Sequence, residues 1–167
     1  MASRVPLNTI KSNLKTLFNN ANTTTASPID LSSDMTKRVQ KVFSIHPEMI
    51  PIQASHYPCV TCYIPDKPIV SQDITKDQLN CKRRATVNID VVGAVWNQNF
   101  LDITKDPADE DINYLMENIE LILRSDSNLA GSVTWQKPTT CNYYSTILNS
   151  TVHLRVGILK LEAEVFY

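Results

Sequence analysis

The sequence contains one short motif of the kind that binds metals or exchanges disulfides, Cys59-x-x-Cys62. Zinc would need this pair together with further ligands, such as Cys81, Cys141 or a histidine, and such pairs are normally presented on a turn. Here the pair lies at the start of a predicted strand, where residues three apart point to opposite faces. A redox disulfide is disfavoured too, because Tyr63–Pro65 follows the second cysteine in place of a helix that could lower a thiol pKa. We therefore predict ordinary half-buried thiols, with no metal and no cofactor.

The other ionisable groups do not form a recognisable catalytic motif. The histidines His46, His56 and His153 are scattered, and no nucleophile elbow accompanies them, so we predict structural or surface roles. The acidic run 106–111 lies where a helix begins, and the helix dipole explains it without a metal. The basic run 82–84 precedes a strand; it could contact a phosphate or a partner carboxylate, or be a solvated strand end.

Composition excludes several classes of protein. The chain of 167 residues has only three glycines, so it contains neither of the glycine-rich loops that cradle nucleotide phosphates. Its net charge of −1 argues against an affinity that depends on neutralising many phosphates. With no signal peptide and no apolar stretch of membrane-spanning length, we expect synthesis in a host cytoplasm and no membrane partner.

The length fits one domain of α+β class with a short appendage. Apolar residues recur at helical spacing from Leu7 to Phe18, which predicts a helix that ends near Asn19-Asn20. A polar, turn-rich stretch runs from there to Asp34. We therefore divide the chain into an N-terminal helix and linker, residues 1–36, and a main α/β domain, residues 37–167.

The middle of the chain predicts strands separated by prolines. Residues 37–45 read as an edge strand and residues 60–64 as a second strand, and the stretch 65–78 reads as a loop. From Ala85 to Val95, the residues at every second position are apolar or glycine and alternate with Thr86, Asn88 and Asp90, which predicts a strand with one buried face. Residues 97–105 follow as a loop.

The C-terminal part predicts a helix and further strands. An amphipathic helix begins at Asp106-Pro107 and ends at the turn around Gly131. Residues 132–135 and 142–148 read as two arms of an open hairpin that Lys137-Pro138 interrupts. The last strand, residues 151–166, changes the face that carries its apolar residues, which predicts a β-bulge near Gly157–Leu159 or a second half that pairs with a neighbouring subunit.

The order of these elements resembles the tail terminator proteins of long-tailed bacteriophages, also called tail completion or minor tail proteins. The resemblance spans about Arg38 to Tyr167 and is strongest in the segments RRATVNIDVVGAV, 106–133 and 151–167. It implies a single α+β domain, mostly antiparallel β-sheet packed against two main helices, that assembles as a homo-oligomeric ring, typically a hexamer. Such a ring belongs to the virion tail or neck: it caps the tail tube, ends tail polymerisation and meets the head-side connector, while DNA passes through its lumen. A near-neutral lumen would not hold the phosphates.

The sequence offers candidates for the ring or partner interface and leaves rival functions open. Trp96 and Trp135 end predicted strands and could be core aromatics or interface anchors. The arm 136–142 and the loop 97–105 could project from the body. Besides the tail terminator, a head-to-tail stopper and a small cytosolic Cys/His metal-binding or redox enzyme remain alternatives, although we expect no enzymatic activity. The candidate interface residues are Arg83, Arg84, Trp96, Phe100, Trp135, Lys137 and Tyr143.

Overall fold

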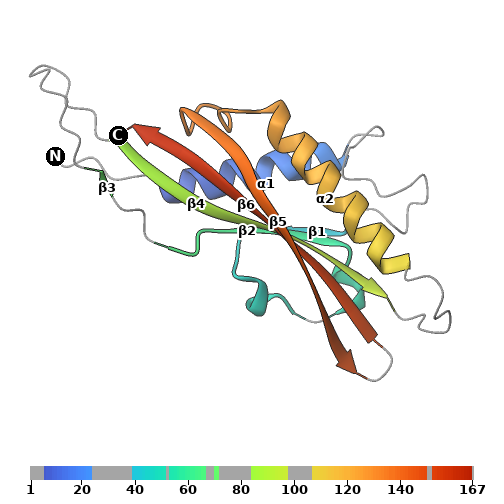
Figure 1. The fold of residues 1–167 in the computed structure, drawn as a ribbon. Coiled ribbons are helices and arrows are strands. Elements are labelled where there is room, and N and C mark those ends of the chain that lie inside the picture. The colour runs from blue at the N-terminus through green and yellow to red at the C-terminus, as the bar shows by residue number, and fades with distance from the viewer. Residues whose placement is uncertain are drawn as a thin grey trace, which may run out of the picture.

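The computed structural model describes residues 6–23, 39–51, 53–66, 70–71, 84–97, 107–149 and 152–166. Two α-helices and six strands make up the described fold, together with two single-turn 3-10 helices (Figure 1). This confirms the predicted α+β fold. In chain order the elements are α1 (Leu7–Thr23), β1 (Lys41–Phe43), η2 (Pro47–Met49), η3 (Ala54–His56), β2 (Cys59–Tyr63), β3 (Val70–Ser71), β4 (Arg84–Asn97), α2 (Pro107–Ser125), β5 (Trp135–Asn149) and β6 (Val152–Phe166).

The strands form one sheet in the order β1-β2-β4-β6-β5, and β3 pairs with the start of β4. Strands β1 and β2 are parallel, and the other described pairs are antiparallel. The sheet is therefore mostly antiparallel, as predicted, and β1 occupies an edge. Strand β3 lies inside the stretch 65–78 that the sequence suggested was all loop.

Both α-helices lie on the same face of the sheet (Figure 1). Helix α1 packs against β1 and β2, and α2 packs against β4, β6 and β5. The apolar stripe predicted for each helix is buried, from Ile10 to Phe18 in α1 and from Ile112 to Leu123 in α2. Helix α1 continues to Thr23, past its predicted end, because Ala21 still packs against the core. Neither α-helix described is both long and apolar enough to span a membrane.

A second, smaller hydrophobic cluster covers part of the opposite face, which we call the far face. The segment that holds η2 and η3 folds beneath the sheet in Figure 1 and supplies Ile50 and Tyr57. These side chains join Cys59 and Ala94 from the strands, and Phe43, Trp96, Leu154 and Val156 pack against them. The sheet is thus covered on both faces over part of its length and on one face elsewhere.

The two hydrophobic clusters on opposite faces explain why the apolar residues of β6 change face along the strand. The predicted bulge in β6 is wrong. Strands β4 and β6 pair without a register shift from Arg84↔Phe166 to Asn97↔His153. Leu154 and Val156 pack into the far-face cluster, whereas Leu159 and Leu161 pack under the helices. The apolar pattern changes face because each half of the strand packs against a different core, and β6 stays in its own sheet throughout.

Strand β5 corrects the predicted hairpin arms. It is one continuous strand from Trp135 to Asn149 with irregularities in its pairing at Thr139 and Leu148. Because β5 is an edge strand, Pro138 can lie within it without breaking a central ladder. Neither irregularity lies opposite Gly157–Leu159, where the sequence predicted a bulge, and that prediction is wrong.

The turn after α2 matches its prediction. Gly131 has φ +79°, a backbone conformation that glycine adopts readily. Buried Gln136 then ties the start of β5 to the helix end, because its Nε2 donates hydrogen bonds to Leu123 O and, at 3.1 Å, to Asp126 O. The predicted loop 97–105 lies, beyond Asn97, outside the described residues, as does the linker after Thr23 as far as residue 38.

Candidate functional site

The Cys59-x-x-Cys62 pair is split between two cores. Cys59 belongs to the far-face cluster, whereas Cys62 lies in the main core under the helices. Both are almost completely buried, more deeply than predicted, and burial raises the pKa of each thiol to about 12. Two side chains on opposite faces of one strand cannot share a metal ion, and a buried protonated thiol is a poor nucleophile. The motif therefore serves packing.

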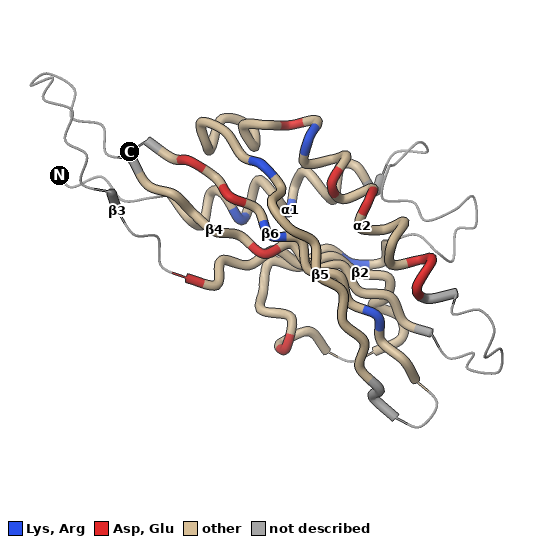
Figure 2. The backbone as a smooth tube through the Cα atoms, viewed as in Figure 1, with Lys and Arg blue, Asp and Glu red and all other residues tan. Residues whose placement is uncertain are grey.

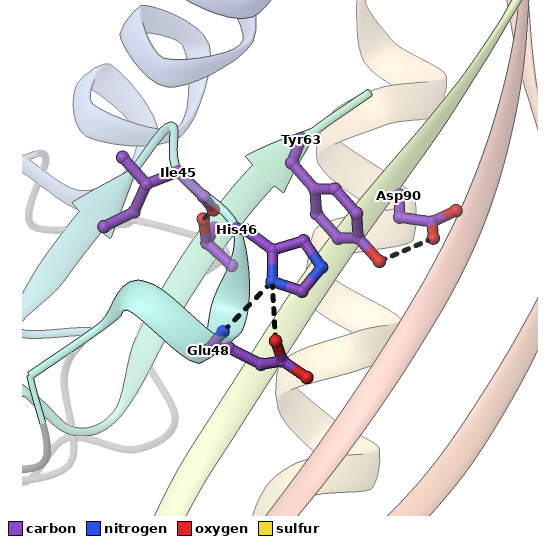
Figure 3. Close-up of polar contacts among 6 residues, drawn as sticks. Ile45, His46, Glu48, Tyr63 and Asp90 are labelled. Carbon is purple, nitrogen blue, oxygen red and sulfur yellow. Dashed lines mark hydrogen bonds and ion pairs between the residues drawn. The ribbon is translucent and has the colours of Figure 1, made fainter. Parts of the chain in front are cut away.

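His46 begins a row of polar contacts on the far face (Figure 3). Glu48 N donates to His46 Nδ1 at 3.3 Å, and the imidazole contacts the Tyr63 ring edge-on with centroids 4.8 Å apart. The Tyr63 hydroxyl donates to Asp90 Oδ2 at 2.9 Å. Burial, and then the hydrogen bond to Asp90, raise the pKa of Tyr63 to about 12. The tyrosine stays protonated at neutral pH and holds the carboxylate in place.

A hollow of about 330 Å³ lies beside this row. Carboxylates of Asp66, Asp90 and Glu162 line it together with Lys160. Such a lining suits a hydrogen-bonding or cationic partner group. Within the part of the chain that the structure describes, no group of three or more His, Cys, Asp and Glu side chains could hold a metal ion.

The structure describes some of the candidate interface residues only in part. Arg83 and Phe100 lie outside the described residues, and of Arg84 only the backbone, at the start of β4, is described. Trp96 packs in the far-face cluster against Tyr57, with ring centroids 5.5 Å apart. Its buried Nε1 has no hydrogen-bond partner among the described residues.

The remaining candidates all lie on β5. Trp135 is half-buried, and Lys137 Nζ lies 5.7 Å from the centre of its ring and 3.9 Å from Glu162 Oε2. Tyr143 is 48% exposed. Desolvation, followed by a hydrogen bond to Cys141, raises the pKa of Tyr143 to about 12, with smaller effects from Glu117 and Glu120 of α2. Tyr143 therefore lies at the junction between β5 and α2.

Strand β5 forms the edge of the sheet opposite β1, and its outer side pairs with no strand in the described parts of the chain. Its first third carries features that discourage strand addition, namely Lys137, Pro138 and the bulge at Thr139. From there to Asn149 the strand has no charged residue, no proline and no glycine, and its neighbouring tyrosines Tyr143 and Tyr144 are 48% and 56% exposed. An uncharged edge of this length is a ready surface for another chain.

Sequence analysis named Tyr143 and Lys137 but missed the continuous edge. The uncharged run TTCNYYSTILN, residues 139–149, is the pattern that could have indicated a long open edge. The predicted hairpin assigned only residues 142–148 of it to a strand. Tyr144 and the polar hollow were missed as well. The hollow brings together four separate segments of the chain, so no local pattern marks it.

Comparisons with known proteins add little to this geometry. No protein-family model matches the sequence, and no curated protein matches it. Among solved structures the chain is similar to one from the "Virion of native gene transfer agent (GTA) particle", with 8% identity and a TM-score of 0.34 over 95% of this chain and 98% of that one. A likeness at that level carries no argument about function.

Proposed function

We propose that this chain is a structural virion protein that assembles as a hexameric ring at the end of a phage tail tube. The ring would stop tube polymerisation and present a surface to the head-side connector, and DNA would pass through its lumen. The support from sequence is the resemblance to tail terminator proteins over about Arg38 to Tyr167. The confirmed α+β fold with a mostly antiparallel sheet is the architecture that this resemblance implies.

The single observation that carries the assembly proposal is the outer edge of β5. Natural proteins protect long edge strands with charges, prolines or bulges, because an open edge invites strand addition. Here none of those devices occurs between the irregularity at Thr139 and the one at Leu148, and this uncharged stretch carries two exposed tyrosines. A surface left open in this way is explained if another subunit covers it in the assembled state.

The enzyme alternative loses its main support because its two cysteines lie in separate cores with raised pKa values. A head-to-tail stopper would bind the connector without binding the tail tube, whereas a terminator binds the tube end. A binding experiment with both partners therefore distinguishes the two alternatives.

The test is to add the purified chain to tail-tube protein during polymerisation and to examine the tubes by electron microscopy. The terminator proposal expects shorter tubes that carry a ring of this chain at one end. Tubes of unchanged length without a cap would contradict it. Binding to the connector ring without binding to tubes would favour the stopper.

A further inference from the structure

The two edges of the sheet differ in charge as well as in position. Helix α1, which packs over β1 and β2, carries Lys11 and Lys15 and no acidic residue, and β1 adds Lys41. Helix α2, which packs over β4, β6 and β5, carries five acidic residues and only Arg124 as a basic one. We call α1 with β1 the basic flank and α2 with β5 the acidic flank.

The charged groups on both flanks reach solvent. Lys15 and Lys41 are exposed on the basic flank, as are Glu110 and Glu117 on the acidic flank. Figure 2 shows acidic residues distributed along α2 from its start to its second half. Glu120 pairs with Arg124 within the helix at 2.5 Å, and Asp109 lies 3.9 Å from Arg155. Even with these pairs, the acidic excess of α2 remains.

Exposed apolar side chains accompany the charges on the acidic flank. On α2, Tyr114 and Leu121 are 46% and 59% exposed, and they alternate with Glu110 and Glu117 along one helix ridge. Tyr143 on β5 lies near enough to Glu117 for the two to interact electrostatically. Aromatic residues are enriched at surfaces that bind another protein, and complementary charges around them fix the partner and its orientation.

From this distribution we infer that the acidic flank of one copy binds the basic flank of the next copy, head to tail. The inference rests on the proposed ring and names the surfaces that close it. A symmetric contact between two β5 edges would bring two acidic flanks together, and like charges across an interface oppose association. A head-to-tail contact places opposite charges together, and repeated by rotation it closes a ring.

The experiment uses two charge-reversed forms of the full chain. One carries Lys15→Glu and Lys41→Glu, so both of its flanks are acidic. The other carries Glu110→Lys and Glu117→Lys, which leaves three acidic and three basic residues on its α2. Each variant alone should associate about tenfold more weakly than wild type, because a favourable contact is lost at every interface. Mixed one to one, they should assemble again as rings of alternating copies. Native flanks then meet at every second interface, and at the others the lysines introduced in one variant face the glutamates introduced in the other.

The control is Thr86→Glu, which adds an acidic group at an exposed position of β4, a strand that belongs to neither flank. It should assemble like wild type, and circular dichroism should show all variants folded. The inference is overturned if either flank variant assembles like wild type, if the mixture stays dissociated, or if the control loses assembly equally. If wild type itself never assembles, even on tail tubes, the proposed ring fails together with the inference.

Discussion

Gly93 of β4 and Gly157 of β6 lie directly opposite each other in the sheet, and both lie under the side chain of Met116 from α2. A Cβ on Gly93 would lie 2.7 Å from Met116 Sδ, and one on Gly157 would lie 2.5 Å from Met116 Cγ. Two of the chain's three glycines thus let α2 approach the sheet closely, and the third forms the turn that follows this helix.

Gly157→Ala should lower the free energy of unfolding by about 1–3 kcal/mol, because the added methyl group overpacks a well-filled core. Gly93→Ala should also destabilise the fold, because its methyl group would meet Leu115 Cδ2 at 3.1 Å as well as Met116 Sδ at 2.7 Å. Urea denaturation measures both. Combining Gly157→Ala with Met116→Ala should give less than the sum of the separate losses, because the smaller side chain leaves room for the methyl group. Strict additivity would contradict this packing account.

Gln136→Leu should destabilise the fold by about 1 kcal/mol or more, because Leu123 O and Asp126 O at the end of α2 lose their donor. Asn142→Leu, an amide removed from an exposed position of the same strand, is the matched control. Thermal unfolding followed by circular dichroism compares the two. Equal losses would mean that the hydrogen bonds to the helix end do not matter.

Stability should fall as pH rises above about 9. Burial raises the pKa of Cys59 and Cys62 from 9.0 to about 12, so between these values the unfolded chain releases thiol protons that the folded chain keeps. Each thiol then removes about 1.4 kcal/mol of unfolding free energy per pH unit over that range. Chemical denaturation from pH 7 to pH 10.5 should show a flatter profile for Cys59→Ala with Cys62→Ala than for wild type. Parallel profiles would show that the thiols titrate normally.

Placing a charge on the open edge should block assembly without unfolding the subunit. Tyr144→Lys introduces a lysine in the uncharged part of β5, where an added strand would bury it. Sedimentation should show a shift to smaller species, while circular dichroism stays unchanged. Thr86→Lys, on an exposed position of the central strand β4, should leave assembly intact. If both substitutions act alike, β5 is not the contact.

Arg83 and Arg84, the second of which begins β4, remain candidates for the ring or partner contact. Arg83→Ala with Arg84→Ala should reduce oligomer size or alter tail length in assembly reactions, because paired guanidinium groups bind carboxylates of a neighbouring chain. Lys160→Ala serves as the control for the loss of a positive charge. Unchanged oligomer size and tail length would remove these residues from the interface.

The sequence predicted those elements in which one face alone is buried. The stripes of α1 and α2 each report a single core, and the structure confirms them. The single buried face predicted for the strand that begins at Ala85 holds only for its first half, because Val92 and Ala94 on the opposite face are buried too. The method failed where two cores share one strand. In β6, Leu154 and Leu159 pack into different clusters on opposite faces of the sheet. If only one core is assumed, the same sequence predicts a bulge.

The candidate surface was harder to predict because it depends on the position of a strand in the sheet. Pro138 would exclude β5 from the centre of a sheet but not from its edge, and only the strand order shows that β5 is an edge. The charge difference between the flanks also requires knowing which helix covers which strands. The opposite charges of Lys15 and Glu117 define two flanks only because α1 and α2 cover opposite halves of the sheet.

The mass of the purified wild-type chain, measured by sedimentation alone and together with tail tubes, tests the central claim most directly. The account predicts a closed oligomer with the mass of a hexamer, formed in solution or on the tube end. It also predicts that Tyr144→Lys prevents this oligomer from forming under both conditions. A wild-type chain that stays monomeric in both, or an oligomer that forms equally well with Tyr144→Lys, would contradict a ring built through the β5 edge.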